Sequence, residues 1–225
     1  MAIKRIFDVD REGATAAATN DDIVGRFRSG QQLNDLPLAL SEWRVTSGDP
    51  SALEGVRKLM GGEEPSKWDT KTEESFELFT TSNSVNVTLD GPTSLRSSMV
   101  LWGRSAKIRQ CNGAEQEDGS PCACPSDIQE LKEQGKQGIA CQPSIQVYFR
   151  LTDAPALGKF KFFSGSWTMA KEMSGAEEAL EAIGGPAFAT LRLELVEYTT
   201  KAGKNVKFTK PVITILGPAE DSEPF

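Results

Sequence analysis

RQCNGAEQEDGSPCACPSDIQELKEQGKQGIACQP, residues 109–143, is the stretch around which the chain is organised, because it contains all four cysteines. Their spacing is C-x10-C-x-C-x16-C, and turn-forming Asn-Gly and Pro residues lie beside each one. Four thiolates brought together by tight turns can close a tetrahedral site, and zinc commonly takes four such ligands in structural sites. We therefore predict a structural Zn2+ site in a zinc-binding insert spanning residues 109–143, with the ligands Cys111, Cys122, Cys124 and Cys141.

The spacing leaves two other interpretations open. The C-x-C pair differs from the C-x2-C knuckle of many zinc sites, so the cysteines could instead be reduced buried thiols, or form disulfides or a redox pair. A reducing compartment favours metal binding over disulfides.

Length and hydropathy describe an ordinary globular chain. Its 225 residues fit one large domain or two small ones, with 38% hydrophobic residues. The first residues, MAIKRIFDVDREG, place charges inside their only apolar patch, which argues against a signal peptide. No run approaches the roughly 18 apolar residues that span a bilayer. We expect a cytoplasmic protein without membrane contact.

Three features of the sequence restrict the chemistry. The chain has no histidine, which excludes every Ser-His, Cys-His or His-metal arrangement. It also lacks a phosphate-binding glycine loop, and we predict that it is not an enzyme and has no small-molecule substrate. The net charge of −7 opposes tight independent binding to DNA, since that affinity comes largely from neutralising phosphates. The charge points instead to a protein partner.

The N-terminal half reads as a flexible arm followed by strands and one helix. Residues 1–24 form the expected arm, in which only residues 3–7 resemble a strand. Asp49 and Pro50 are typical of a helix start, and Gly61-Gly62 of its end. Its expected apolar stripe is Leu53, Val56, Leu59 and Met60. Strand-like alternation follows at residues 76–78, 85–89, 99–102 and 106–108.

The C-terminal third predicts a ββ-helix-ββ region. Two strands, 145–151 and 159–164, form a hairpin, and helical periodicity follows over 169–183, with Ser174 as the start of a second helix. Two further strands, 190–198 and 206–216, are joined by a lysine-containing turn. Within the cysteine window, Ser126 is expected to cap a short helix that Gly135 ends.

We therefore predict an α+β fold: a β-rich single composite domain over residues 25–218, carrying the four-cysteine insert. Residues 219–225, rich in acidic residues and proline, are expected to be a disordered tail.

Lysines cluster on the last predicted hairpin, and we consider them as a partner-binding surface: Lys201, Lys204, Lys207 and Lys210. The alternative is a solvated edge, since lysines protect edge strands from aggregation. Arg104, Lys107 and Arg109 pose the same question before the first cysteine.

Two further groups of residues have a structural explanation. The acidic pairs Glu63-Glu64 and Glu73-Glu74 are expected to be solvated rather than catalytic. The aromatic residues of 148–167 could stack single-stranded bases, but their pattern favours a strand buried on both faces.

Several stretches together resemble one protein family. They are GRFRSGQQLNDLPLALSEWRVTSGDP from Gly25, LWGR from Leu101, the C-N-G…C-A-C-P…C window, VYFRL, FxSGSW and TTKAGK…TKP. In this order, over about residues 25–218, they resemble the recombination directionality factor-like proteins of actinobacterial temperate phages and prophages.

The resemblance implies a non-catalytic factor that binds a phage large serine integrase on attachment-site DNA. Such a factor suppresses attP × attB integration and permits attL × attR excision. The alternative is an accessory protein of phage DNA replication or metabolism that binds single-stranded DNA or a replication protein.

Overall fold

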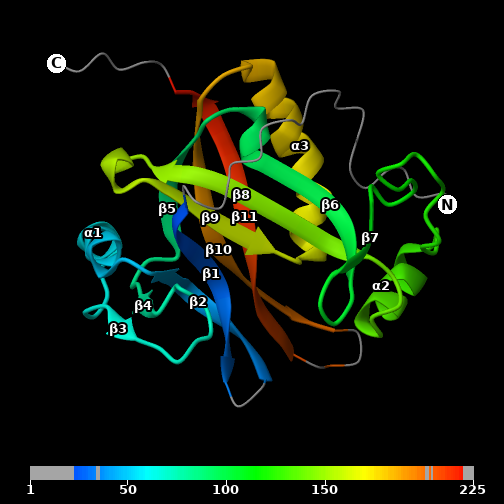
Figure 1. Cartoon of the computed structure of the whole chain (residues 1–225), viewed down its shortest axis with the longest axis horizontal. Coiled ribbons are helices and arrows are strands. Elements are labelled where there is room, and N and C mark those ends of the chain that lie inside the picture. Colours follow the sequence, from blue (N-terminus) through cyan, green and yellow to red (C-terminus); the bar gives the residue numbers. More distant parts are fainter. Residues whose placement is uncertain (1–22, 34–35, 201–202, 204, 220–225) are drawn as a thin grey trace.

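The computed structural model describes residues 23–33, 36–200, 203 and 205–219 (Figure 1). Its strands, within these residues, are β1 (Ile23–Leu33), β2 (Leu36–Ser47), β3 (Ser66–Lys67), β4 (Phe76–Phe79), β5 (Ser84–Leu89), β6 (Leu95–Trp102), β7 (Lys107–Cys111), β8 (Gln142–Leu151), β9 (Lys159–Ser164), β10 (Ala187–Thr199) and β11 (Asn205–Pro218). Its α-helices are α1 (Pro50–Met60), α2 (Ile128–Lys136) and α3 (Trp167–Ile183), and two short 3-10 helices are η2 (Pro92–Ser94) and η3 (Pro155–Leu157).

These strands form one mixed sheet in the order β11-β10-β5-β8-β9-β1-β2-β4-β3, with β6 and β7 as a branch. Among the strand pairs of the described residues, β1–β9 alone is parallel, and the others are antiparallel. α1 and α2 lie at opposite sides of the molecule (Figure 1), and α3 packs against β11. No helix of the described part is long and apolar enough to cross a membrane.

Strand β8 is the centre of the sheet. One edge pairs with β9 along residues 145–150, while the other pairs first with β6 and then, at Arg150 and Leu151, with β5. Seven of its ten residues are buried, as expected for a strand covered on both faces. β8 begins at Gln142, directly after the last cysteine, so the cysteine segment is attached to the most buried strand.

An aromatic cluster fills the core beside β8. Its members meet edge to face or stacked at centroid distances of 5.2–6.3 Å: Phe27, Trp43, Phe149, Phe160 and Phe162. Such pairs add about 0.5–1.5 kcal/mol each beyond the burial of their area. The prediction that the 148–167 aromatics are core residues is confirmed for most of them, but Phe163 is 52% exposed.

Helix α1 begins and ends as predicted. The Asp49 side chain accepts a hydrogen bond from the Ser51 N–H, and Gly61 closes the helix at φ 70°. The predicted stripe is wrong at Leu59, which is 44% exposed, whereas Ala52 is buried. Ala52 lies four residues before Val56 and seven before Leu59, on the same face, so this face is buried in the first turns of the helix and becomes exposed at Leu59.

Helix α3 is continuous, so the predicted restart at Ser174 is wrong. Met173 and Ala176 are buried on either side of that position, and one apolar face is therefore maintained throughout. Ser166 caps the helix by accepting from the Met169 N–H, and Gly184 ends it in the left-handed conformation.

Helix α2 differs slightly from its prediction. The N-cap is Asp127 instead of Ser126, because its carboxylate accepts from two amides, those of Gln129 and Glu130. Gly135 does not end the helix. A Cβ added at Gly135 would lie 3.0 Å from the Gln142 Cγ. The Gln142 side-chain amide donates to the Gly135 carbonyl at 2.6 Å. A larger residue there would require the Gln142 side chain to shift by a few tenths of an ångström.

The β-rich composition and the ββ-helix-ββ order of β8, β9, α3, β10 and β11 are confirmed. The domain limits 25–218 remain a prediction, although β1 already begins at Ile23. The expected arm up to residue 22, with its strand at 3–7, and the tail from residue 220 lie outside the described residues.

Candidate functional site

The four cysteines converge on one point, as their spacing predicts. Cys111 ends β7, Cys141 precedes β8, and Cys122 and Cys124 lie in the loop between β7 and α2. Their sulfur atoms all lie within 4.8 Å of one another. All four are free thiols rather than disulfides.

The cluster is compatible with a metal site. A metal with metal–sulfur bonds near 2.3 Å would hold tetrahedral sulfurs about 3.8 Å apart, so small movements would close the cluster around one ion. Cys111 and Cys141 are buried, whereas Cys122 and Cys124 are half-buried. The sulfurs are therefore largely shielded from solvent on the side facing the core.

The loop before α2 is shaped by local hydrogen bonds. The Asn112 carboxamide oxygen accepts from the Ala114 and Glu115 amides, at 2.9 and 2.8 Å. The Cys122 N–H then donates to the Ala114 carbonyl at 2.7 Å. These bonds turn the chain back so that Cys122 and Cys124 reach Cys111.

Arg109 is the charged residue nearest the sulfurs, and its place there was not predicted. Its Nε donates to the Cys141 sulfur and its Nη2 to the Cys124 sulfur, both at 3.5 Å. The sequence had grouped Arg109 with Arg104 and Lys107 as a basic patch. Its position two residues before Cys111 is the signal that could have indicated otherwise, since residues i and i+2 of a strand share a face.

Hydrogen bonds within the cluster separate the thiol pKa values. The pKa of Cys124 is lowered well below its usual range, because the Cys111 and Cys141 thiols donate to its sulfur. The pKa of Cys111 is raised because its proton is held by Cys124 and Cys141, and by burial. The pKa of Arg109 is raised, chiefly by its bond to Cys141. The pKa of Cys141 is also raised, to about 11, with hydrogen bonding to Cys124 and burial among the causes. The cluster therefore favours a thiolate at Cys124, the state that binds metals, and protons on Cys111 and Cys141 that a metal would have to displace.

The lysine hairpin is the long ribbon of β10 and β11. Lys201 and Lys204 lie outside the described residues. Lys207 is exposed and pairs with Glu197 on the opposite strand at 2.6 Å. Lys210 is half-buried and bridges Glu194 and Glu172, at 3.1 and 3.5 Å, and its pKa is raised, first by the hydrogen bond to Glu194. Lys210 therefore fastens the ribbon to α3, while Lys207 faces solvent.

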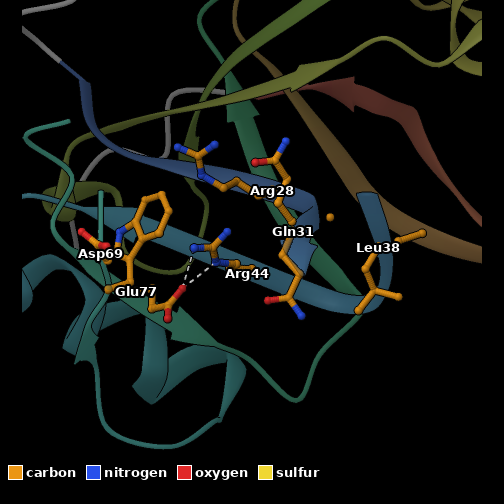
Figure 2. Close-up of a pocket in the computed structure, with 10 residues that line it drawn as sticks. Arg28, Gln31, Leu38, Arg44, Asp69 and Glu77 are labelled. Atoms are coloured by element: carbon orange, nitrogen blue, oxygen red, sulfur yellow. Dashed lines mark hydrogen bonds and ion pairs between the residues drawn. The ribbon is translucent and has the colours of Figure 1, made fainter. Parts of the chain in front are cut away.

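A groove of about 880 Å³ runs along β1 and β2 (Figure 2), and both of its arginines are paired with carboxylates. The Arg44 guanidinium bonds Glu77 at 2.6–2.7 Å and lies 4.4 Å from the Trp68 ring centroid. Arg28 bonds Glu74 at 2.8 Å. Because these two cations already have carboxylate partners, we interpret the groove as part of the structure rather than as a ligand site.

The acidic pairs behave differently from one another. Glu63 and Glu64 are exposed, in agreement with the expectation. Glu74 is not simply solvated, because it pairs with Arg26 and Arg28 and accepts from the Thr46 hydroxyl. That part of the prediction is wrong, because the fold brings two cations of β1 and a hydroxyl of β2 to this carboxylate.

Comparison with known proteins gives a specific result. No solved structure matches the chain. A family model described as Gp3-like, recombination directionality factor-like, matches residues 24–216. The match includes the sheet core, the helices α1, α2 and α3, and the thiol cluster. The chain therefore belongs to the recombination directionality factor-like family.

Proposed function

We propose that this protein binds a large serine integrase on attachment-site DNA and switches it from attP × attB integration to attL × attR excision. The observation that carries the proposal is the family match over residues 24–216. The net charge of −7 and the absence of histidine support a factor that acts through a protein partner and performs no chemistry itself.

Such a factor acts by differential affinity. A ligand shifts a conformational equilibrium only by as much as it prefers one state, and moving the balance from 1:99 to 99:1 needs a preference of about 10⁴-fold. The factor must also occupy the integrase, so it works at roughly stoichiometric levels.

We also propose that the metal is Zn2+, held by Cys111, Cys122, Cys124 and Cys141. The support is the all-sulfur donor set, which suits zinc better than hard cations that prefer oxygen. When bound, zinc would supply folding free energy to the insert. Elemental analysis should find about one zinc per chain, and metal-free protein with four titratable thiols, purified without chelator, would exclude this proposal.

The functional experiment is a purified recombination assay with the integrase of the same phage or prophage. Adding the protein should permit attL × attR recombination and depress attP × attB recombination, with half-maximal effect near one protein per integrase. If both reactions are unchanged, the proposed function is wrong. Steeply salt-dependent binding of the isolated protein to single-stranded DNA would then support the replication or metabolism alternative.

A further inference from the structure

The β6–β7 hairpin has an exposed tip with an unusual composition. Trp102 is 61% exposed and Ile108 is 65% exposed. Tryptophan is highly buried on average, so the exposure of Trp102 beside another large apolar side chain needs an explanation.

A β-bulge gathers these side chains on one face. The register runs from Leu101↔Arg109 to Trp102↔Lys107, so Ile108 is the extra residue of β7. In a bulge two residues of one strand oppose a single residue of the other, and here Lys107 and Ile108 oppose Trp102. The Ile108 side chain lies over the Gly103 backbone, where an added Cβ would come within 3.0 Å of its Cγ1.

On the opposite face of the hairpin, contacts with the core and the thiol cluster hold its base in place. Leu101 is only 8% exposed, and Arg109 donates to the thiol cluster. Cys111 pairs with Met99, and β6 pairs with β8 as far as Val100↔Gln142. The tip therefore projects beyond the end of β8 from a base held by the core and the thiols. Recognition residues are often carried this way, on a loop positioned by a rigid scaffold.

The charge of the tip indicates what it contacts. Residues 101–110, LWGRSAKIRQ, contain three cations and no acidic residue, in a chain of net charge −7. Arg109 is turned to the sulfurs and Lys107 bonds Glu117 at 3.1 Å, while Arg104 is exposed in the turn. An exposed tryptophan and isoleucine beside arginine match the composition of binding hot spots.

We propose that the β6–β7 tip docks onto an apolar strip bordered by carboxylates on the integrase, with Trp102 and Ile108 as anchors and Arg104 supplying charge complementarity. This inference rests on the proposed function. It adds a contact surface to the candidate lysine ribbon.

The test measures binding of purified protein to the DNA-bound integrase. Trp102→Ala should weaken binding by about 30-fold or more, as truncation of a hot-spot anchor does, and Arg104→Glu should also weaken it. The matched controls are Phe163→Ala, an aromatic residue 52% exposed on β9, and Lys71→Glu, an exposed cation before β4. Both controls should bind like wild type. All four melting temperatures should stay within about 2 °C of wild type, since these sites are exposed.

The outcomes separate the two proposals. If wild type binds and Trp102→Ala binds equally well, the docking surface is wrong and the proposed function stands. If wild type does not bind the integrase, the proposed function fails and this inference fails with it. If Trp102→Ala reduces binding to naked DNA but not to the integrase, the tip is a base-stacking element and the docking proposal is overturned.

Discussion

At the scale of single residues, ion pairs stabilise the edge of the sheet that lies far from the thiol cluster. The Arg44 side chain is 7% exposed and its partner Glu77 is 16% exposed. Removing one member of such a pair leaves a desolvated charge, which costs far more than the pair itself contributes. The same guanidinium stacks over Trp68, so the pair also fixes the β3–β4 region.

Glu77→Gln should therefore lower the free energy of unfolding by about 2 kcal/mol. The control is Glu133→Gln, which removes the exposed Lys136–Glu133 pair of α2 (70% and 63% exposed) and should change it by less than about 0.5 kcal/mol. Urea unfolding at constant m-value measures both. Equal shifts in the two variants would mean that burial of the Arg44 pair has no energetic consequence.

At the level of single elements, α3 contains a glycine with no packing role. Gly175 is exposed within the helix, and nothing lies within 4 Å of an added Cβ. Gly175→Ala should raise the free energy of unfolding by about 0.5–1 kcal/mol, because alanine loses less conformational entropy. Gly184→Ala is the contrast: its φ of 70° makes it destabilising by about 1–2 kcal/mol. Thermal or urea unfolding distinguishes them, and destabilisation by Gly175→Ala would contradict a continuous α3.

The β10–β11 ribbon remains a candidate contact element. Lys204→Glu with Lys207→Glu should impair attL × attR excision, if the ribbon contacts the integrase, while leaving the fold intact. Lys58→Glu with Lys71→Glu is the matched control on exposed residues. Each Lys→Glu changes the charge by −2, so both double variants change it by −4, from −7 to −11. Wild-type excision by the ribbon variant would identify Lys204 and Lys207 as a solvated edge.

Elements with a strong local signal were predictable from the sequence. The caps at Asp49 and Ser166 and the β8–β9 hairpin have their own residue patterns, and the cysteine spacing predicted one cluster. Long-range pairing was not predictable. The parallel β1–β9 pair, the Arg26 and Arg28 partners of Glu74, and the bulge at Ile108 depend on which strands become neighbours. Local periodicity contains no information on that choice.

At the scale of the whole molecule, the thiol cluster is continuous with the main core rather than a separate module. Cys111, Leu131 and Cys141 belong to the same buried cluster as the β8 residues. Loss of metal from a site of four thiols removes folding free energy from the segments that it joins. We therefore expect a graded effect, strongest in the insert and its attached hairpin.

Hydrogen exchange of metal-loaded and chelator-treated protein measures this gradient. After metal removal, amide protection should fall in residues 107–141 and in the β6–β7 tip, because Cys111 joins that hairpin to the cluster. Protection should persist in β9 and in residues 187–193 of β10, whose partners are other strands of the sheet. Cys122→Ser should reproduce the chelator pattern, whereas Ser120→Ala, a half-buried residue of the same loop whose hydroxyl bonds its neighbours Gln116 and Asp118, should not. Uniform loss across the sheet would show that the metal holds the entire fold. An unchanged pattern, in protein shown to lose its metal, would show that hydrogen bonds and packing alone hold the insert.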